Sequence, residues 1–282
     1  MARAVVRDRV AAFVAEHSRD EVVVVGVSGG GDSNALIGAL QAALRATGRQ
    51  LVAYTLVCEP VWPEASADRA ATLCRRHGVE HRVLGAPEIE RLLDMRGTVP
   101  ELHDAFLDRF GQDTAHFFAT HMISLAGRAV CRELRTSEYC LGFNREDVLA
   151  EALFSVINGR PPLAFPVRCF GTIRVLMPVW EIPKLVLDAC YPDFSKRNYE
   201  QRIPTTPQRG LIYFLAHAVE GVYSNLGLSL MAGLGRIFED AWPTLRADPD
   251  FDFHSEQIVG HGDLAAAREF LAEHFRPRTE CS

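Results

Sequence analysis

The chain of 282 residues carries a net charge of −6, with 48% hydrophobic and 23% charged residues, as expected of a globular protein that buries a sizeable core. No apolar run reaches the roughly 18 residues of a membrane helix, and no cleavage signal follows the scattered charges of the first residues, so we expect a cytoplasmic protein outside the membrane. Seven scattered cysteines argue against a disulfide framework, and the acidic charge argues against an extended nucleic-acid face, although a local patch for RNA stays open.

Strand and helix patterns alternate along the first part of the chain. Apolar residues at helical spacing predict a leading helix, and a β-branched run predicts a buried strand whose following helix ends near residue 48. The other predicted elements are a helix at 66–79 and strands at 51–60 and 81–85, with the first helix at 3–17 and the first strand at 22–27. Alternation with short connections is typical of a doubly wound parallel sheet, in which ligands bind outside the carboxyl ends of the strands.

The second part of the chain is less regular. Residues 87–111 are interpreted as an insertion or a lid, and the remaining elements are expected as helices at 113–135, 147–159, 181–190 and 263–275 and strands at 138–143 and 172–179. The apolar stretch 211–234 is expected to be helical, either as a buried helix pair or as a surface that faces a partner such as a second copy. We expect an α/β domain at 1–190 and a helical C-terminal extension at 191–282.

The turn between the first strand and its helix carries the strongest chemical signal. It reads V-S-G-G-G-D-S, and the candidate nucleotide contacts are Val27, Ser28, Gly29, Gly30, Gly31, Asp32 and Ser33. Three glycines let a phosphate approach the main chain, and the helix N-terminus adds partial positive charge. The serines can donate hydroxyl groups, and Asp32 can hold a magnesium ion that bridges phosphate oxygens. A glycine turn that merely ends the strand is the alternative.

Two familiar phosphate-binding loops do not fit this turn. A P-loop needs a lysine before its closing Ser or Thr, and the only lysines of the chain are Lys184 and Lys196. A dinucleotide fingerprint needs a third glycine where Asn34 stands. The remaining pattern, S-G-G-x-D-S, resembles the loop of the PP-loop superfamily, the N-type ATP pyrophosphatases. This resemblance implies an adenine nucleotide alpha hydrolase-like (HUP-type) fold, ATP bound at the loop, and attack of a substrate oxygen on the α-phosphate.

A second motif follows the predicted strand at 138–143. Its members are Gly142, Asn144, Asp147 and Glu151. Asp147 and Glu151 stand four residues apart on one helix face and can hold a divalent cation, while simple capping of the helix is the alternative. The segment LGFNREDVLAEA resembles the G-H-x-x-D-D-x-x-E-T segment of PP-loop enzymes that modify tRNA. The stretches LMPVWEIPKLVLDAC and SKRNYEQR resemble later segments of that family more loosely.

The two motifs define the candidate site. We expect Asp32 and Asp147 to act in catalysis, and Asp32, Asp147 and Glu151 to bind Mg²⁺. Besides the glycine turn, the expected nucleotide contacts are Tyr54, Arg132, Gly142 and Asn144. Arg132 and Arg128 are the best cations on the central helix for phosphate charge, and two exposed helix arginines are the alternative.

The sequence departs from the tRNA-modifying enzymes in ways that bear on the reaction. Phe143 stands where that family usually has histidine, and Glu146 where it has the first aspartate. Its sulfur-inserting members hold an iron–sulfur cluster with a C-x-x-C on the central helix, whose positions fall near His121 and Ser124 here. No C-x-x-C occurs in this chain, so we expect no cluster.

The expected function is ATP-dependent adenylation of a substrate oxygen with release of pyrophosphate, after which sulfur or an amine displaces AMP. The motifs are most similar to those of tRNA 2-thiocytidine and 2-thiouridine synthetases and, more distantly, tRNA lysidine synthetases. The acceptor is therefore expected to be a tRNA base or a small heterocycle or acid, and a partner protein could deliver the sulfur or amine. Cys131 and Cys190 are core residues or, alternatively, persulfide carriers. The alternative function is a non-catalytic module that binds or senses an adenine nucleotide.

Overall fold

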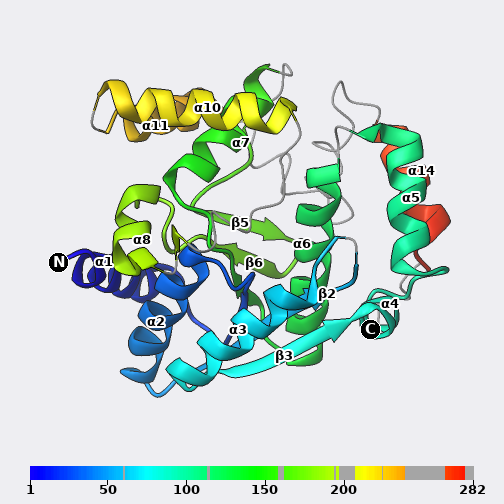
Figure 1. Cartoon of the computed structure of the whole chain (residues 1–282), viewed down its shortest axis with the longest axis horizontal. Helices are drawn as coiled ribbons and strands as arrows, with labels where there is room; N and C mark the ends of the chain where they lie inside the picture. The colour runs from blue at the N-terminus through cyan, green and yellow to red at the C-terminus, as the bar shows by residue number, and fades with distance from the viewer. Residues whose placement is uncertain are drawn as a thin grey trace.

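A six-stranded sheet forms the centre of the molecule (Figure 1). The computed structural model describes residues 1–59, 61–112, 115–157, 162–193, 195–196, 207–223, 225–238 and 264–276. The strands are β1 (Val22–Gly26), β2 (Gln50–Val57), β3 (Glu80–Gly85), β4 (Glu138–Cys140), β5 (Val167–Phe170) and β6 (Ile173–Leu176). Their spatial order is β3-β2-β1-β4-β6-β5, and every neighbouring pair is parallel except β5 and β6.

Helices cover both faces of the sheet, which confirms the predicted doubly wound α/β fold. The helices among the described residues are α1 (Ala2–His17), α2 (Gly31–Arg45), α3 (Glu64–His77), α4 (Ala86–Leu92), α5 (Val99–Phe110), α6 (Ala115–Glu133), α7 (Arg145–Ile157), α8 (Lys184–Cys190), α10 (Pro207–Val222), α11 (Leu226–Phe238) and α14 (Leu264–His274). The helices α1, α2, α3 and α8 share one buried cluster with the sheet, and α4, α5 and α6 share another.

Alternate residues of β1 contribute to the two buried clusters, one on each face of the sheet. Val23 and Val25 belong to the cluster of α1 and α2, whereas Val24 belongs to the cluster of α6. Successive side chains of a strand point to opposite faces, so an unbroken valine run suits a strand that is buried from both sides. This run accounts for the position of β1 in the interior of the sheet.

Two segments differ from the expected pattern. Residues 87–111 contain two helices, α4 and α5, instead of irregular chain. A capping box starts α5: the N–H of Glu101 donates to the Thr98 hydroxyl at 3.4 Å, and the N–H of Thr98 donates to the Glu101 carboxylate at 2.8 Å. The sequence pattern also missed β5, an antiparallel edge strand next to β6.

The predicted apolar helix of the C-terminal extension is divided into α10 and α11 by a turn at Asn225, whose φ is 68°. One side of the pair packs on α7 through residues such as Ile212 and Met231. Phe214 and Leu215, on the other side, are exposed. The stretch is therefore buried against α7 on one side, and a partner for the exposed side stays a prediction.

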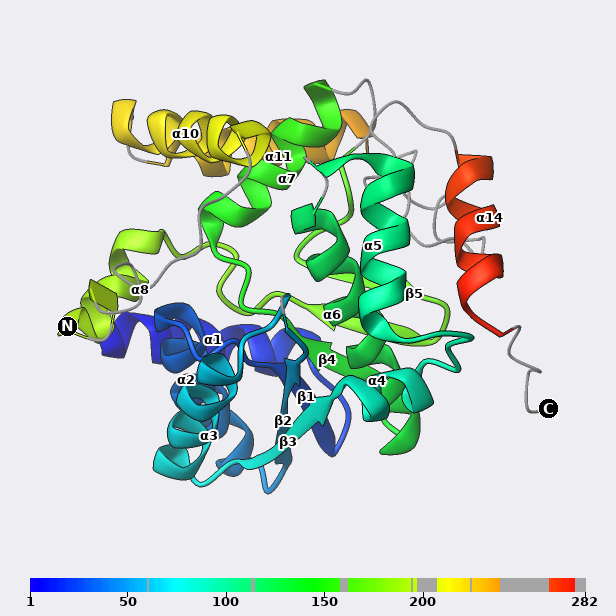
Figure 2. The same cartoon turned by 45° about the vertical axis from the view of Figure 1, so that its right-hand side comes forward.

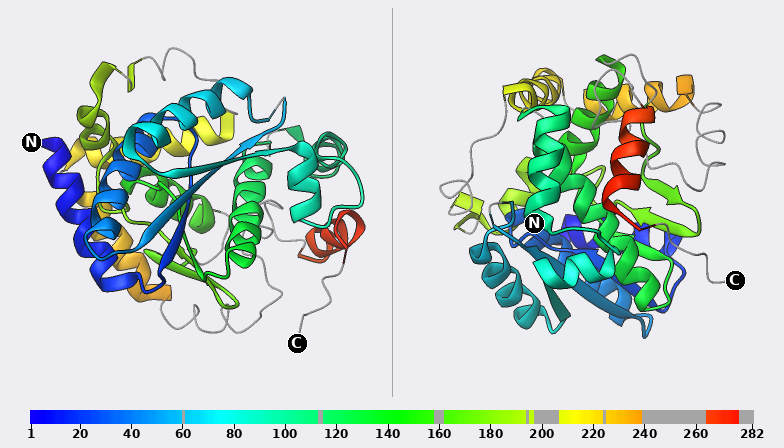
Figure 3. Two further views of the ribbon diagram at one scale, coloured as in Figure 1. Left: turned by 90° about the horizontal axis from the view of Figure 1, so that it is seen from below. Right: turned by 90° about the vertical axis from the view of Figure 1, so that its right-hand side faces the viewer.

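The last helix, α14, returns to the α/β domain and lies beside α5 (Figure 3). Phe270 packs edge-on against Phe106 with ring centroids 5.8 Å apart, and Arg109 pairs with Glu269. The division of the chain after residue 190 stays a prediction, and residues 197–206, with most of the SKRNYEQR stretch, lie outside the described residues. Across the described ranges, none of the helices is both long and apolar enough to cross a membrane.

A polar network closes the edge of the sheet at which the strands begin. Glu138 is fully buried and accepts a hydrogen bond from the Arg174 guanidinium at 2.6 Å. Asp20 accepts hydrogen bonds from the hydroxyls of Thr136 at 2.7 Å and Ser137 at 2.8 Å. Burial acts to raise the pKa of Asp20, but the hydrogen bonds from Ser137 and Thr136 and the charge of Arg174 outweigh it, so the pKa lies below its usual value.

We expect Asp20→Asn to lower the free energy of unfolding by about 1–2 kcal/mol at pH 7, because hydrogen bonds to a partly solvated carboxylate are weakened. Since the folded pKa is the lower one, this contribution is present above the unfolded value of about 3.9 and is lost as the pH falls through the folded value. Urea unfolding at neutral and at acidic pH checks this, with a smaller difference expected in acid. Asp68→Asn, at an exposed position of α3, is the matched control. An equal loss at both pH values would contradict the prediction.

Candidate functional site

The glycine turn and the Asn144 motif follow two neighbouring strands. β1 and β4 pair in parallel within the sheet, with Val25 opposite Cys140 (Figure 2). The strand order reverses here, because β1 is followed outward by β2 and β3 on one side, and β4 by β6 and β5 on the other. Ligands of doubly wound sheets bind at such a reversal, outside the carboxyl ends of the strands. The topology therefore brings the two predicted motifs to one place.

The glycine turn is held closely against α3. Gly29 has a φ of +71°, and a Cβ atom there would lie 2.6 Å from the carbonyl oxygen of Ser66. Gly30 caps α2, which begins at Gly31. Any larger residue at position 29 would be both strained and blocked. The first N–H groups of α2 lack partners inside the helix, as at other helix N-termini, and their contact with a phosphate stays a prediction.

Ser28 and Ser33 brace the turn from within. Their hydroxyl oxygens lie 3.1 Å apart, and the N–H of Ser28 donates to the Ser33 hydroxyl at 3.2 Å. The N–H of Gly30 in turn lies 3.4 Å from the Ser28 hydroxyl. These bonds hold the shape of the turn, and contact of the hydroxyls with phosphate stays a prediction.

Asp32 is the residue at which the motifs meet. Its Oδ2 accepts a hydrogen bond from the Asn144 amide at 3.2 Å, and its Oδ1 lies 3.0 Å from the ammonium of Lys184. Burial raises the pKa of Asp32, the charge of Lys184 acts in the opposite direction, and the carboxylates of Asp147 and Asp188 add to the rise. Lys184 also pairs with Asp188. The site thus contains a carboxylate in contact with a cation at the glycine turn.

Lys184 is the site residue that sequence reasoning missed. It lies at the first position of α8, far from the turn in sequence, and the backbone N–H of Lys184 donates to the buried carboxylate of Glu146 at 2.8 Å. Glu146 thereby fixes where α8 begins. This contact gives a structural role to the glutamate that stands where the tRNA-modifying enzymes have their first aspartate. The sequence contains a signal that could have identified Lys184. Lysine is rare in this chain, which has only two, and Lys184 directly follows a proline at the start of a predicted helix.

Asn144 and Asp147 form a reciprocal cap at the start of α7. The N–H of Asn144 donates to the Asp147 carboxylate at 3.0 Å, and the N–H of Asp147 donates to the Asn144 side-chain oxygen at 3.0 Å. The Tyr213 hydroxyl of α10 donates to the other oxygen of Asp147 at 2.7 Å. Burial raises the pKa of Asp147, and these hydrogen bonds act in the opposite direction. Capping is therefore what Asp147 does in this structure, and its role toward a metal stays a prediction.

Arg145, between these two residues, links the turn to the C-terminal helices. Its guanidinium lies 2.9 Å from the Glu220 carboxylate of α10 and donates to the carbonyl oxygen of Glu181 at 2.6 Å. Arg145 is only 6% exposed, so this ion pair is largely removed from water. The described part of the extension is thus fastened to the turn that carries Asn144.

Glu151 pairs with a buried arginine in this structure, and its role as a metal ligand stays a prediction. Its carboxylate pairs with the guanidinium of Arg168, a β5 residue that is 1% exposed. The Nε of Arg168 donates to the Ala164 carbonyl at 3.1 Å. Glu151 and Asp147 share a helix face as expected, but the buried arginine takes the Glu151 carboxylate because its own charge needs a partner there.

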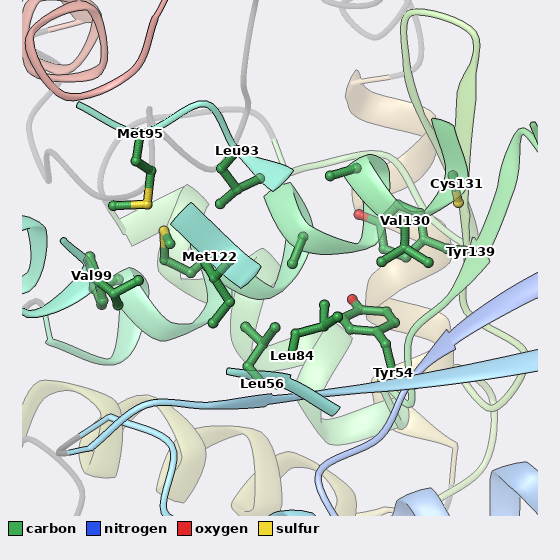
Figure 4. Close-up of a cluster of buried hydrophobic side chains, with 14 of the residues drawn as sticks. Tyr54, Leu56, Leu84, Leu93, Met95, Val99, Met122, Val130, Cys131 and Tyr139 are labelled. Carbon is green, nitrogen blue, oxygen red and sulfur yellow. The ribbon is translucent and has the colours of Figure 1, made fainter. Parts of the chain in front are cut away.

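Tyr54 and Val27 belong to the core. Tyr54 is 1% exposed, and its hydroxyl donates to the carbonyl oxygen of Ile123 on α6 at 2.8 Å. Figure 4 shows its ring among the buried side chains between the sheet and α6. The N–H of Val27 donates to the Tyr54 carbonyl at 2.9 Å, and the Val27 carbonyl accepts from the Thr55 hydroxyl at 2.7 Å. The predicted nucleotide contact of Tyr54 is therefore corrected to a core role, and Val27 supports the turn.

Arg132 is also separated from the other candidates. Arg132 lies in the last turn of α6, and the chain then enters β4. Arg132 is therefore at the edge of the sheet where the strands begin. The glycine turn is at the opposite edge, where the strands end. The prediction of a nucleotide contact for Arg132 is corrected on this ground. Arg128 lies over the ring of Phe170 at 4.7 Å. Gly142 does lie in the turn after β4, where a Cβ atom would be 3.5 Å from Leu36 of α2.

The positions compared with a cluster-binding motif are core positions here. His121 is 4% exposed, and the Ser124 hydroxyl lies 2.9 Å from the Tyr139 hydroxyl. Cys131 is fully buried, and burial raises the pKa of its thiol to about 12, with the carboxylates of Asp20 and Glu138 adding to the rise. A thiol of this kind is a poor nucleophile, which favours the core interpretation of Cys131.

The fold is similar to solved structures of two enzymes. One is the U34-tRNA thiolase NcsA from Methanococcus maripaludis with its [4Fe-4S] cluster, at a TM-score of 0.65 and 16% identity over 95% of this chain and 87% of that chain. Another is NMN synthetase from Francisella tularensis, at a TM-score of 0.51 and 14% identity over 88% of this chain and 99% of that chain. No protein-family model and no curated protein sequence matches the chain. At these identities the likenesses show the fold alone, an α/β fold of the kind that the sequence predicts.

We expect Glu151→Gln to lower the free energy of unfolding by about 3–5 kcal/mol, because it leaves the charge of Arg168 buried without its partner. The double variant Glu151→Gln with Arg168→Met should recover most of this loss. Nucleotide affinity of the folded single variant should stay unchanged. Thermal unfolding and nucleotide titration check these points, with Glu273→Gln at an exposed position of α14 as the control. If Glu151→Gln is stable but loses Mg²⁺-dependent nucleotide binding, Glu151 acts as a metal ligand and the prediction of unchanged affinity is wrong.

Proposed function

We propose that the protein is an ATP-dependent adenylating enzyme of the PP-loop type. One observation carries the proposal: Asp32 of the glycine turn lies 3.2 Å from the Asn144 amide and 3.0 Å from the Lys184 ammonium. A glycine turn at a helix N-terminus, a carboxylate and a cation thus occupy one edge of the sheet, which supports a phosphate-binding role for the turn. The similar solved structures, those of a tRNA thiolase and an NMN synthetase, support a reaction of this class.

The proposed first step is the adenylation of an acceptor oxygen. That oxygen attacks the α-phosphorus of ATP, a new P–O bond forms, and the bond to the β-phosphate breaks to release pyrophosphate. The N–H groups at the start of α2 and the ammonium of Lys184 stabilise the negative charge that develops on the leaving pyrophosphate. In the second step, sulfur or an amine attacks the activated carbon, and AMP leaves.

Mg²⁺ fits this site with two protein carboxylates. Among the described residues, no group of three or more His, Cys, Asp or Glu side chains is placed to hold a metal ion. Asp32 and Asp147, however, both contact Asn144, which follows β4 beside the glycine turn. Proteins usually bind Mg²⁺ through one or two carboxylates together with substrate phosphates. Asp32 and Asp147 would hold the ion in this way, and it would neutralise phosphate charge.

The acceptor is a tRNA base or a small heterocycle or acid. Similarity to a tRNA thiolase favours tRNA, whereas the net charge of −6 favours a small molecule. The sulfur or amine donor can be a small molecule or a partner protein. We also propose that the protein is cytoplasmic. The exposed side of α10 and α11 is the proposed interface of a homodimer.

We expect Mg²⁺-dependent release of pyrophosphate from ATP that is stimulated either by total tRNA or by a small-molecule extract. Asp32→Asn should reduce this release by about a hundredfold, because the charge that balances Lys184 and holds Mg²⁺ is lost. A coupled pyrophosphate assay measures both effects. Asp104→Asn, at an exposed position of α5, is the matched control and should keep full activity.

The acceptor fraction that stimulates release separates the two acceptor classes. Stimulation by tRNA assigns the enzyme to tRNA modification, and stimulation by the small-molecule fraction alone assigns it to biosynthesis. ATP binding without turnover on either fraction would overturn the adenylation proposal and favour a nucleotide-sensing module.

A further inference from the structure

A buried serine lies directly over the glycine turn. Ser195 follows α8 in the chain and is 4% exposed. Its Oγ lies 2.6 Å from the position that a Cβ atom would take at Gly31, the first residue of α2. Glycine is needed at position 31 for this close approach, because any side chain there would displace the serine.

The hydroxyl of Ser195 has no hydrogen-bond partner among the described residues. Its backbone is anchored, since the N–H of Ser195 donates to the Tyr191 carbonyl at 3.0 Å. Leaving a buried hydroxyl without a partner costs free energy, and native structures seldom keep such a group unless something else satisfies it. The observation therefore points to a ligand at the turn.

The surroundings of this hydroxyl favour an anion as the ligand. α2 spans 15 residues, and the N–H groups of its first turn have no partners within the helix. The carboxylate of Asp188 lies 3.7 Å from the Cβ position of Gly31, but it is paired with the Lys184 ammonium. Helix N–H groups, a hydroxyl donor and an ammonium thus meet at one point, as binding of phosphate oxygens requires.

We propose that Ser195, which lies against Gly31 of the glycine turn, donates a hydrogen bond to the pyrophosphate end of the nucleotide. The inference rests on the proposed function for its ligand, ATP, but it concerns the polyphosphate and not the nucleoside. It makes Ser195 a binding residue that distinguishes ATP from AMP.

The test compares inorganic pyrophosphate, ATP and AMP as ligands of the full chain, each with Mg²⁺. Ser195→Ala should weaken binding of pyrophosphate and ATP about tenfold or more, because a hydrogen bond to a charged oxygen is lost, while AMP affinity stays within about twofold. Without ligand, the melting temperature of the variant should be equal or higher, because the hydroxyl makes no hydrogen bond to the described residues that the substitution could remove. Ser229→Ala, at an exposed position of α11, is the control.

Each outcome decides between a ligand contact and a packing role. Unchanged pyrophosphate affinity in Ser195→Ala overturns the inference, and so does an equal loss for all three ligands together with a lower melting temperature. Should Ser195→Ala fail to fold, Ser195→Cys keeps a side chain of similar size with a weaker hydrogen-bond donor. This variant should also bind pyrophosphate and ATP more weakly while its affinity for AMP stays nearly unchanged. Because pyrophosphate binds without any reaction, this result is independent of turnover: an unaltered protein that binds pyrophosphate but not ATP overturns the proposed function and leaves the Ser195 contact standing.

Discussion

The side chain of Asn144 joins the two halves of the sheet at the point where the strand order reverses. Its amide group donates to Asp32, its carbonyl oxygen accepts from the N–H of Asp147, and its own backbone N–H donates to the Asp147 carboxylate. An aspartate at position 144 could cap α7 as well, but it would put a second negative charge against Asp32. The cap of α7 and the orientation of Asp32 therefore depend on one uncharged group that both donates and accepts.

The turn after β4, which carries Asn144, also holds the start of α8. The carboxylate of Glu146 accepts the backbone N–H of Lys184, and the neighbouring Arg145 holds the carbonyl of Glu181. These main-chain contacts determine where α8 begins, and the ammonium of Lys184 then reaches Asp32. The candidate site is consequently built by three connections of the sheet, and the glycine turn supplies only the part that is predicted to bind phosphate.

The local features of the site could be predicted, because each is encoded within a few residues. The strand, glycine turn and helix follow from a valine run and three glycines, and the second motif follows from its spacing. The partners of the side chains could not be predicted, because they come from distant segments: Arg168 takes Glu151, and Lys184 reaches Asp32. Tyr54 was misplaced for the same reason, since only the fold shows that its hydroxyl faces α6.

The distribution of charge at this edge of the sheet favours a nucleotide that arrives with its counter-ion. Asp147 and Asp188 both raise the pKa of Asp32, and the cations that act on this group of carboxylates within the described part of the chain include Lys184, beside Asp32, and Arg209, near Asp147. Lys184 is shared between Asp32 and Asp188, so its charge is already engaged. A bare polyphosphate would add negative charge to partly buried carboxylates, which is unfavourable in a medium of low dielectric constant. Under the proposed function, the same carboxylates therefore select the magnesium complex of ATP, while the helix N–H groups recognise its phosphates.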